Sequence, residues 1–248
     1  MKTTLSLVAV LGLAAACRAG DVPLPPPAPA FTIDLGNRQA QAVPTRVGFT
    51  HTGGGNIDVQ QPTPDSLVVT MTGVAVAGGH PCKDSLATLA FDLSQEFEIT
   101  AAKPEFKRAK VTIEARVIGL LRSPKCGGGS ASITCPAHAF VAPAGVVGEV
   151  PAAVEATLPG RSVAGGESLS VNDKTGPVAA VVPVGKYTLR QAFGVQAAHS
   201  KKLLGKAASA EFAPDPALDP LWISAFEPFH GAQKKDFGFQ VIVRVAPE

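Results

Sequence analysis

Hydrophobic and polar residues alternate one by one over many short segments of this chain, which is the pattern of a β-strand with one buried face. Over residues 111–117 every odd position is apolar and every even position is polar, and the odd positions are apolar again over residues 237–245. Residues 199–210 give the best helical pattern, but paired lysines and a glycine weaken it. Further strands are predicted at residues 31–35, 43–50, 67–76, 86–93, 97–99, 130–135, 150–156, 169–171, 187–197 and 207–212.

Glycine and proline separate these segments. The chain has 25 Gly and 22 Pro, with glycine triplets at residues 53–55 and 127–129. Many short strands separated by turns, without interleaved helices, predict an all-β fold of antiparallel sheets stacked as a β-sandwich, immunoglobulin-like or jelly-roll-like. We expect one sandwich domain over residues 31–248. The loop-like composition near residue 145 leaves a split into two domains open, although no charge shift or polar linker accompanies it.

One short motif supports this architecture. Residues 183–189 read Pro-Val-Gly-Lys-Tyr-Thr-Leu. The Gly-x-Tyr-x-Leu pattern resembles the turn into the penultimate strand of immunoglobulin-like sandwiches. The resemblance implies that Tyr187 is a buried corner tyrosine whose hydroxyl bonds the preceding backbone. It bears on architecture and not on function.

The N-terminus has the layout of a secretory signal peptide over residues 1–19. Lys2 precedes an apolar stretch, residues 5–16, and small residues follow. Such a stretch is too short for a permanent membrane-spanning helix. Residues 20–30 are rich in proline, and a segment of this composition is stiff and extended. We interpret it as a linker, or stalk, between a membrane and the folded domain.

The end of the signal segment carries a second pattern. Residues 13–17 read Leu-Ala-Ala-Ala-Cys and resemble the lipobox of bacterial lipoproteins, although Ala14 stands where leucine is usual. The resemblance implies that Cys17 becomes the acylated first residue and attaches the protein to a membrane. Ordinary cleavage after Ala16 or Ala19 is the alternative, and it would give a freely secreted or periplasmic protein. In either case we expect an exported protein of bacterial origin.

Composition and charge bear on the class of partner. Hydrophobic residues make up 46% of the chain and charged residues 17%, so the chain is expected to be globular. The net charge is +2 and is spread along the sequence. Residues 103–110 form the densest basic stretch, but Pro104, Glu105 and Phe106 interrupt it. Because binding to phosphates requires clustered Lys and Arg, no nucleic-acid partner is predicted.

The cysteines stand at positions 17, 82, 126 and 135. In an oxidising compartment we predict a disulfide between Cys126 and Cys135. The three glycines between them can reverse the chain, and residues 130–134 look like the returning strand of a hairpin, whose strands lie close enough for such a bond. The disulfide would contribute about 2–3 kcal/mol. Cys82 then stays free, while Cys82–Cys126 and Cys82–Cys135 remain as alternative pairs.

The same cysteines are close in sequence to histidines. His80 and Cys82 flank one proline, and Cys135 stands three positions before His138. Together with Cys126 they could form a thiolate and imidazole site for zinc or copper, although the spacings match no standard zinc pattern. A disulfide together with ordinary surface histidines is the main interpretation. No cofactor is predicted.

The sequence carries no motif that indicates catalysis. It has no Gly-x-Ser-x-Gly elbow, no His-Glu-x-x-His pair and no phosphate-binding glycine loop. Glu96 and Glu98 are two residues apart, so on a strand they share one exposed face instead of straddling a substrate. Asp215 and Asp219 stand among prolines, which makes them turn formers as readily as calcium ligands. A non-enzymatic role is therefore favoured, and a catalytic site assembled from residues distant in sequence is left open.

These observations favour a structural or binding role in the cell envelope or outside the cell, with a glycan or protein partner. A carbohydrate-binding module is one alternative. Its stacking residue would be Trp222, the single tryptophan, whose apolar neighbours favour a place in the core. A metal-binding protein that uses the Cys and His residues is the other alternative.

Overall fold

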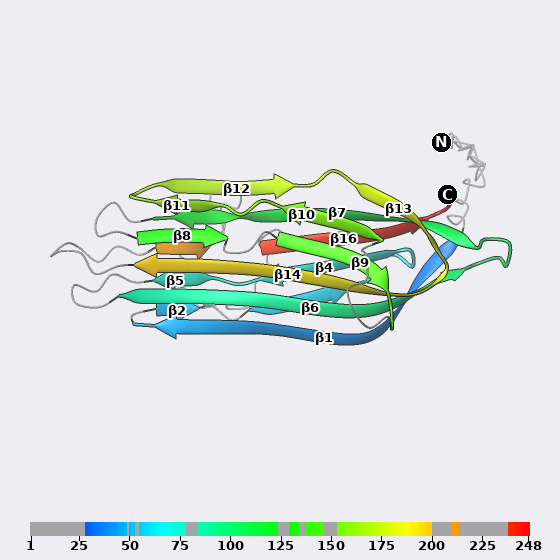
Figure 1. Cartoon of the computed structure of the whole chain (residues 1–248), viewed down its shortest axis with the longest axis horizontal. Helices are drawn as coiled ribbons and strands as arrows, with labels where there is room; N and C mark the ends of the chain where they lie inside the picture. The colour runs from blue at the N-terminus through cyan, green and yellow to red at the C-terminus, as the bar shows by residue number, and fades with distance from the viewer. Residues whose placement is uncertain are drawn as a thin grey trace, which may run out of the picture.

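The computed structural model describes residues 28–48, 50–52, 55–77, 84–123, 129–133, 137–145, 153–199, 210–213 and 238–248. Every regular element in these ranges is a β-strand, and the strands form two antiparallel sheets that pack together (Figure 1). The predicted all-β sandwich is therefore confirmed. The described residues include no helix that is long and apolar enough to cross a membrane.

One sheet has seven strands, each antiparallel to its neighbours: β1 (Phe31–Val47), β6 (Ser85–Ala101), β8 (Gly129–Ile133), β9 (Ala137–Pro143), β10 (Val154–Leu158), β11 (Ser162–Ala164) and β14 (Gly185–His199). Their order is β1-β6-β14-β8-β11, with β9 beside β14 and β10 beside β9. β8 and β9 follow one another along the same edge of β14, so together they occupy the place of one long strand.

The other sheet has nine strands: β2 (Thr50–Thr52), β3 (Asn56–Gln60), β4 (Ser66–Thr72), β5 (Ala75–Ala77), β7 (Arg108–Arg122), β12 (Ser168–Lys174), β13 (Val178–Pro183), β15 (Ala210–Ala213) and β16 (Gly238–Ala246). Their order is β2-β5-β15-β7-β16-β4-β3. β15 and β16 follow one another along one edge of β7, and β12 and β13 follow one another along its other edge. β7 is thus the central strand to which most of this sheet is joined.

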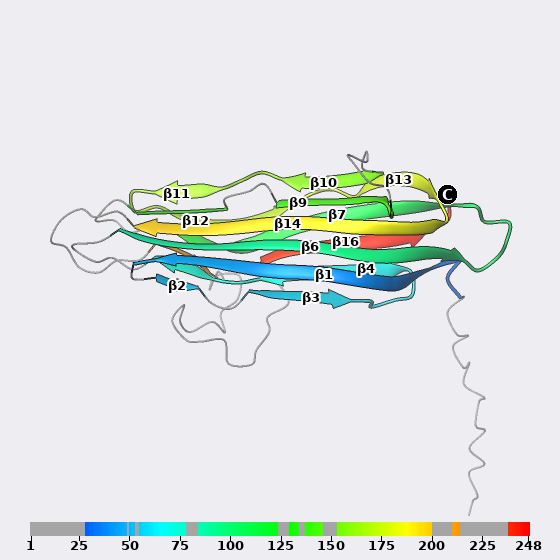
Figure 2. The same cartoon turned by 60° about the horizontal axis from the view of Figure 1, so that its bottom comes forward.

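The sandwich is elongated, because its longest strands run along its full length (Figure 2). β1 and β6 have 17 residues each, which corresponds to roughly 55 Å at about 3.3 Å per residue. Phe31 pairs with Ala101 in the first sheet, and Ala246 pairs with Lys110 in the second. Since residues 102–107 connect these two pairs, the start of β1 and the end of β16 lie at the same end of the molecule (Figure 1).

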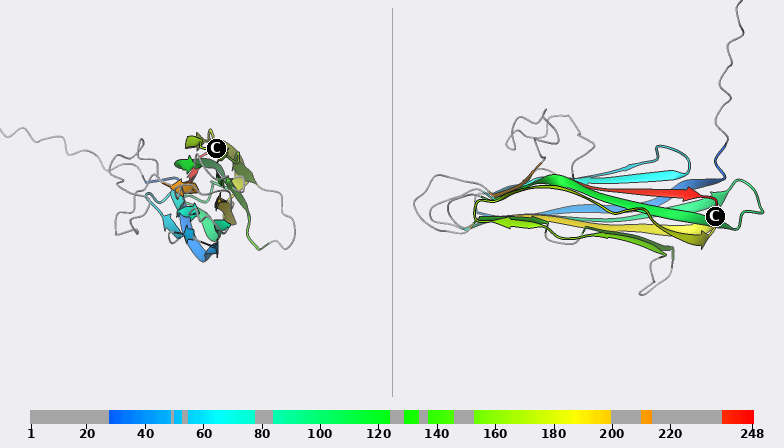
Figure 3. Two further views of the ribbon diagram at one scale, coloured as in Figure 1. Left: turned by 90° about the vertical axis from the view of Figure 1, so that its left-hand side faces the viewer. Right: turned by 90° about the horizontal axis from the view of Figure 1, so that it is seen from above.

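Alternate side chains of both sheets point between them and form the core, and the two layers are seen end-on and from above in Figure 3. Along β6 every odd position from 85 to 99 is buried. Aromatic rings connect the sheets at the centre. The ring of Phe193 lies 5.8 Å from that of Phe91 in the same sheet and 5.6 Å from that of Phe239 in the opposite sheet. The alternation read from the sequence therefore reports a real buried face.

Several strand boundaries differ from the predicted ones. Predicted strands 31–35 and 43–50 belong mostly to one strand, β1, whose register against β6 shifts between Leu35 and Arg38. The predicted strand 67–76 is instead split at Gly73 into β4 and β5. A Cβ atom at Gly73 would lie 2.2 Å from Cδ2 of Leu89, so the chain passes close to the opposite sheet where it breaks. β3, β9, β11 and β13 were not predicted.

A buried glutamine maintains the irregularity in β1. Gln95 of β6 is only 2% exposed and points into the sandwich. Its Nε2 donates to the carbonyl oxygens of Gly36 and Asn37, at 3.2 and 3.4 Å, and to that of Glu96 at 2.7 Å. These carbonyls belong to the register shift, where regular pairing is interrupted. The side chain therefore replaces hydrogen bonds that the sheet ladder does not provide.

The predicted corner tyrosine is confirmed. The hydroxyl of Tyr187 donates to the carbonyl oxygen of Pro183 at 2.6 Å, and the residue is buried. Its ring stacks on that of Phe97 with 5.9 Å between centroids. Burial raises the pKa of the phenol, because desolvation disfavours the charged form.

An arginine connects the two sheets at each lateral edge. At the β1 edge, Nη2 of Arg38 donates to the carbonyl oxygen of Ile57 in β3 at 2.7 Å. At the opposite edge, Arg161 lies between β10 and β11 and binds Asp173 of β12 through Nε and Nη2, at 2.7 and 3.1 Å. The carboxylate raises the pKa of the Arg161 guanidinium through this hydrogen bond and through its charge. Pro44 in β1 removes a donor from the first edge, a common protection of edge strands.

Candidate functional site

The outer faces of the two sheets carry charge of opposite sign. Pairing register and burial show which side chains point outward on the seven-stranded sheet, and carboxylates outnumber cations there. Lys186 and Arg190 are the outward cations among the described residues of this sheet. Its outward carboxylates are Asp34, Asp92, Glu96, Glu98 and Glu155. The prediction that Glu96 and Glu98 share one exposed face is confirmed.

The nine-stranded sheet has a mainly basic outer face. Among its described side chains, Asp58 and Glu114 are the outward carboxylates. Its outward cations are Arg108, Lys110, Arg116, Arg122, Lys174 and Arg244. Since the whole chain has a net charge of only +2, this segregation arises from the way alternating positions are distributed between the faces.

A groove of about 360 Å³ lies on this basic face. It runs beside the central strand β7, between the end of β12 and the outward side chains of β16. Most of its lining is charged or polar, and the lining residues are Glu114, Ala115, Arg116, Asn172, Lys174, Thr175, Gln240 and Ile242.

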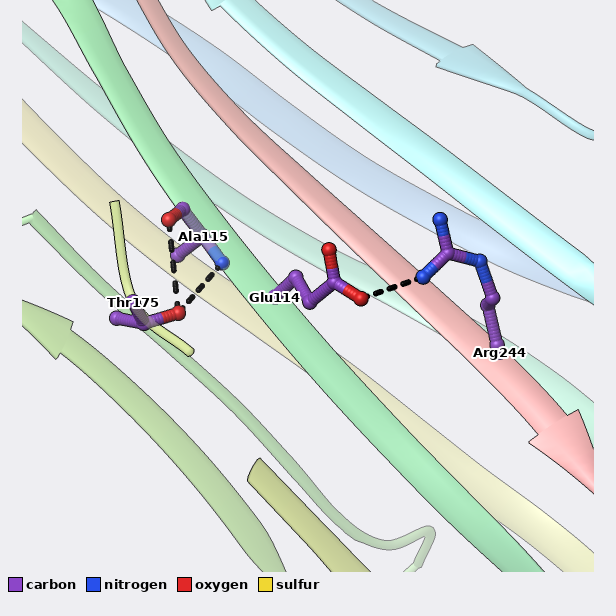
Figure 4. Close-up of polar contacts among 4 residues, drawn as sticks. All are labelled: Glu114, Ala115, Thr175 and Arg244. Atoms are coloured by element: carbon purple, nitrogen blue, oxygen red, sulfur yellow. Dashed lines mark hydrogen bonds and ion pairs between the residues drawn. The ribbon is translucent and has the colours of Figure 1, made fainter. Parts of the chain in front are cut away.

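The groove exists because the strand pairing beside β7 is interrupted. β12 ends at Lys174 and β13 begins at Val178, so the intervening residues leave the ladder. Thr175 closes the interruption, because its backbone N–H donates to the carbonyl oxygen of Ala115 at 2.8 Å. Its Oγ1 accepts from the N–H of Ala115 at 2.9 Å (Figure 4). The wall of the groove is thus fixed by hydrogen bonds to the central strand.

Two cations on neighbouring strands line this groove. Lys174 is directly opposite Arg116 in the pairing of β12 with β7. Nε of Arg116 donates to Oδ1 of Asn172 at 3.1 Å. Within the part of the chain that the structure describes, no carboxylate lies within 4.0 Å of either cation. Like charges directly opposite on neighbouring strands are destabilising, so this pair costs stability unless an anion neutralises it.

The nearest acidic residue of the groove is already engaged. Oε1 of Glu114 accepts a hydrogen bond from Nη1 of Arg244 at 2.6 Å (Figure 4). Gln240 stands opposite Arg116 on the other side of β7 and adds an amide. The groove therefore presents cationic and amide donors together, which suits binding of anionic groups and hydroxyls.

Of the predicted metal ligands, only His138 lies within the described residues. It points outward from β9, and its Nε2 is 3.0 Å from Oε1 of Glu155 without the alignment of a hydrogen bond. The described residues contain no group of three or more His, Cys, Asp and Glu side chains able to hold a metal ion. His80 and Cys82, together with Cys126 and Cys135, lie outside the described residues.

The described strands show where the segments that contain Cys82 and Cys126 join the sandwich. Ser85, which follows Cys82 by three positions, and Gly129, which follows Cys126 by three, both pair with His199 at one end of the sandwich. His138 pairs instead with Ala192, roughly 23 Å further along β14. The described strands therefore set His138 apart from the strand ends that lead to Cys82 and Cys126, whereas Ile133, which precedes Cys135 by two positions, pairs with Val195 near His138.

The hairpin expected between Cys126 and Cys135 is not formed by the strands on either side. β8 pairs with β14 and β11 in the seven-stranded sheet, whereas β7 belongs to the nine-stranded sheet. The predicted disulfide loses this geometric support, although the bond itself stays a prediction. Other predicted residues also lie outside the described residues, namely Cys17, Asp215, Asp219 and Trp222.

Sequence reasoning missed the basic face, although its signal is present. In the segment 108–116 the even positions include Arg108, Lys110 and Arg116. In the segment 92–98 the even positions include Asp92 and two glutamates. Counting charge by strand face, and not along the chain, separates the two surfaces. The position of Lys174 opposite Arg116 depends on pairing between distant segments, and no local sequence pattern predicts it.

Comparison with known proteins gives no relative from which a function could be transferred. No protein-family model, no curated protein sequence and no solved structure matches this chain.

Proposed function

We propose that this chain is an exported, non-enzymatic protein of the cell envelope that acts by binding. Residues 1–19 direct its export, and acylation of Cys17 attaches it to a membrane. The Pro-rich residues 20–30 separate the sandwich from that membrane. A disulfide between Cys126 and Cys135 is the expected state of the thiols in the oxidising compartment.

The observation that carries the binding role is the groove beside β7. Its cations, Arg116 and Lys174, oppose each other without a carboxylate partner among the described residues. A ligand that neutralises both charges would account for such a pair on an open sheet face. The shape of the sandwich agrees with this role, because β1 begins at one end of an elongated body (Figure 2). A stalk joined there leaves both outer faces accessible.

A glycan is the ligand class that the groove favours over a protein. Asn172, Thr175 and Gln240 place amide and hydroxyl groups beside the two cations. Hydroxyl-rich ligands are recognised by such a combination of donors and acceptors. The apolar members of the lining are Ala115 and Ile242, which give little of the hydrophobic area that protein interfaces bury at their centre.

Two measurements test this proposal. Fractionation of the native host, followed by intact-mass analysis, should place the protein in the envelope with a diacylglyceryl group on Cys17. A free N-terminus at Cys17 or Gly20 would refute the lipid anchor while leaving export intact. A screen of the purified protein against soluble polysaccharides and envelope fractions should give a ligand. Recovery of the protein in the cytoplasm, or a screen without any ligand, would contradict the proposed function.

A further inference from the structure

We infer that the groove and the basic face around it bind an acidic polysaccharide, one whose sugar units carry carboxylate or sulfate groups. This inference rests on the proposed binding function and specifies its ligand. The primary contact is the pair formed by Arg116 and Lys174, and the neighbouring amides of Asn172 and Gln240 bind sugar hydroxyls.

The opposed pair of Arg116 and Lys174 is electrostatically unfavourable in the free protein. Two cations directly across neighbouring strands repel each other, and Glu114, the nearby carboxylate, is held by Arg244. An anionic group placed between Arg116 and Lys174 removes the repulsion and accepts charge-assisted hydrogen bonds from both side chains. An anionic ligand therefore gains hydrogen bonds to both cations and relieves a repulsion that is present in the free protein.

The arrangement of the other cations favours a polymer over a small anion. Arg108 and Lys110 project from the same face of β7 as Arg116. Lys110 stands six residues before Arg116, roughly 20 Å along an extended strand. An extended polyanion that follows β7 contacts both positions, whereas a single small anion reaches only one. The acidic outer face of the other sheet repels the same polymer and directs it to this side.

The chemistry of the face distinguishes a polysaccharide from other polyanions. Single-stranded nucleic acids are held largely by bases stacked on aromatic rings. The outward positions described on β7, β12 and β16 carry no aromatic side chain. Insertion into a lipid surface needs exposed large apolar side chains, and Ile242 is half-buried. Cations interspersed with amides and hydroxyls instead match a hydroxylated polyanion.

The experiment compares two charge reversals that alter the net charge equally. Lys174→Glu places a carboxylate opposite Arg116, whereas Lys186→Glu changes the outer face of the other sheet. Dissociation constants are measured for the purified protein with polygalacturonate, dextran sulfate, neutral dextran and single-stranded poly(dT) at low and moderate salt. We expect tight binding to one of the acidic polysaccharides, with a dissociation constant raised about tenfold by Lys174→Glu. The slope of log Kd against log salt concentration should fall by at least about one, because fewer counterions are released on binding.

Misfolding cannot imitate this result. Lys174→Glu replaces a repulsive pair by an attractive one, so its thermal midpoint should equal or exceed that of the wild type. Lys186→Glu should retain the binding. Equal loss in both variants, or none in Lys174→Glu, would refute the site. Neutral dextran bound as tightly as the acidic polymers would refute the ligand class while supporting a glycan-binding function, and a preference for poly(dT) would assign the face to nucleic acid.

Discussion

The two sheets share one apolar core, but among the described residues the buried glutamines and the buried histidine all belong to one sheet. The seven-stranded sheet directs Gln95, Gln191 and His199 inward, and each of these residues is at least nine-tenths buried. The nine-stranded sheet directs its notable polar groups outward, where Arg116 and Lys174 line a groove. Buried polar groups determine how strands fit together, whereas outward groups are free to bind. The sheet with buried polar groups therefore shapes the fold, whereas the other sheet carries the proposed ligand site.

The largest effect on stability is expected for Gln95→Leu. The substitution removes the donor to the carbonyl oxygens of Gly36, Asn37 and Glu96, and leaves the register shift of β1 without these bonds. Loss of hydrogen bonds to partly buried acceptors should lower the free energy of unfolding by about 2 kcal/mol. Denaturant unfolding measures it. An unchanged midpoint would show that the shift in β1 does not depend on this side chain.

A matching substitution on the neighbouring strand should change stability in the opposite direction. Gln191 of β14 pairs with Leu93, which stands two positions before Gln95 in β6. Gln191 is 2% exposed, and neither Oε1 nor Nε2 has a hydrogen-bond partner among the described residues. An unsatisfied buried amide costs free energy, and methionine has a similar shape without this cost. Gln191→Met should therefore stabilise the protein by about 1 kcal/mol in the same unfolding measurement. A loss of stability would show that the amide is satisfied in solution and that the two glutamines are equivalent.

Tyr187→Phe tests the corner of the seven-stranded sheet. The variant keeps the stacking on Phe97 and loses the bond to the carbonyl oxygen of Pro183, so we expect a loss of about 1 kcal/mol. The raised pKa also predicts a pH effect. Above the unfolded pKa of about 10 the unfolded chain loses the phenolic proton first, so stability falls as pH rises further. This contribution to the alkaline loss should vanish in Tyr187→Phe, and an identical pH profile for both proteins would contradict it.

The fold was readable from the sequence where one strand face is buried and the other is polar. β6, β7, β14 and β16 all show this alternation, and all were predicted in part or in full. β9 was missed because its buried positions are mostly alanines, which give a weak hydrophobic signal. The continuity of β1 was missed because the register shift at Leu35 moves the inward positions from odd to even numbers.

The site was less accessible to sequence reasoning than the fold. The outward positions of β7 show their charges locally, so the basic face could have been found by separating the two faces of each strand. The groove could not, because it requires Lys174 opposite Arg116 and an interruption closed by Thr175. Both depend on pairing between segments that are far apart in the chain. Tertiary register, which local patterns do not encode, therefore creates the groove.

The smallest effects are expected at the two lateral edges, where they can still be told apart by salt. Arg161 binds the carboxylate of Asp173 across the sheets, and both side chains are partly exposed, at 44% and 26%. Arg38 binds the neutral carbonyl oxygen of Ile57 at the other edge. Exposed ion pairs contribute little and are screened by salt, whose Debye length falls to about 3 Å at 1 M.

We therefore expect Arg161→Met to lower the unfolding midpoint slightly in dilute buffer and to match the wild type in about 1 M NaCl. Arg38→Met should lose a similar amount under both conditions, because a hydrogen bond to a carbonyl group depends less on long-range charge. A double-mutant cycle of Arg161→Met with Asp173→Asn isolates the pair from the packing of each side chain. A coupling free energy of zero between Arg161 and Asp173 in dilute buffer would contradict this difference between the edges. A stronger salt dependence for Arg38→Met would contradict it as well. The contacts at both edges would then follow from sheet packing, since the ion pair would add no cohesion of its own.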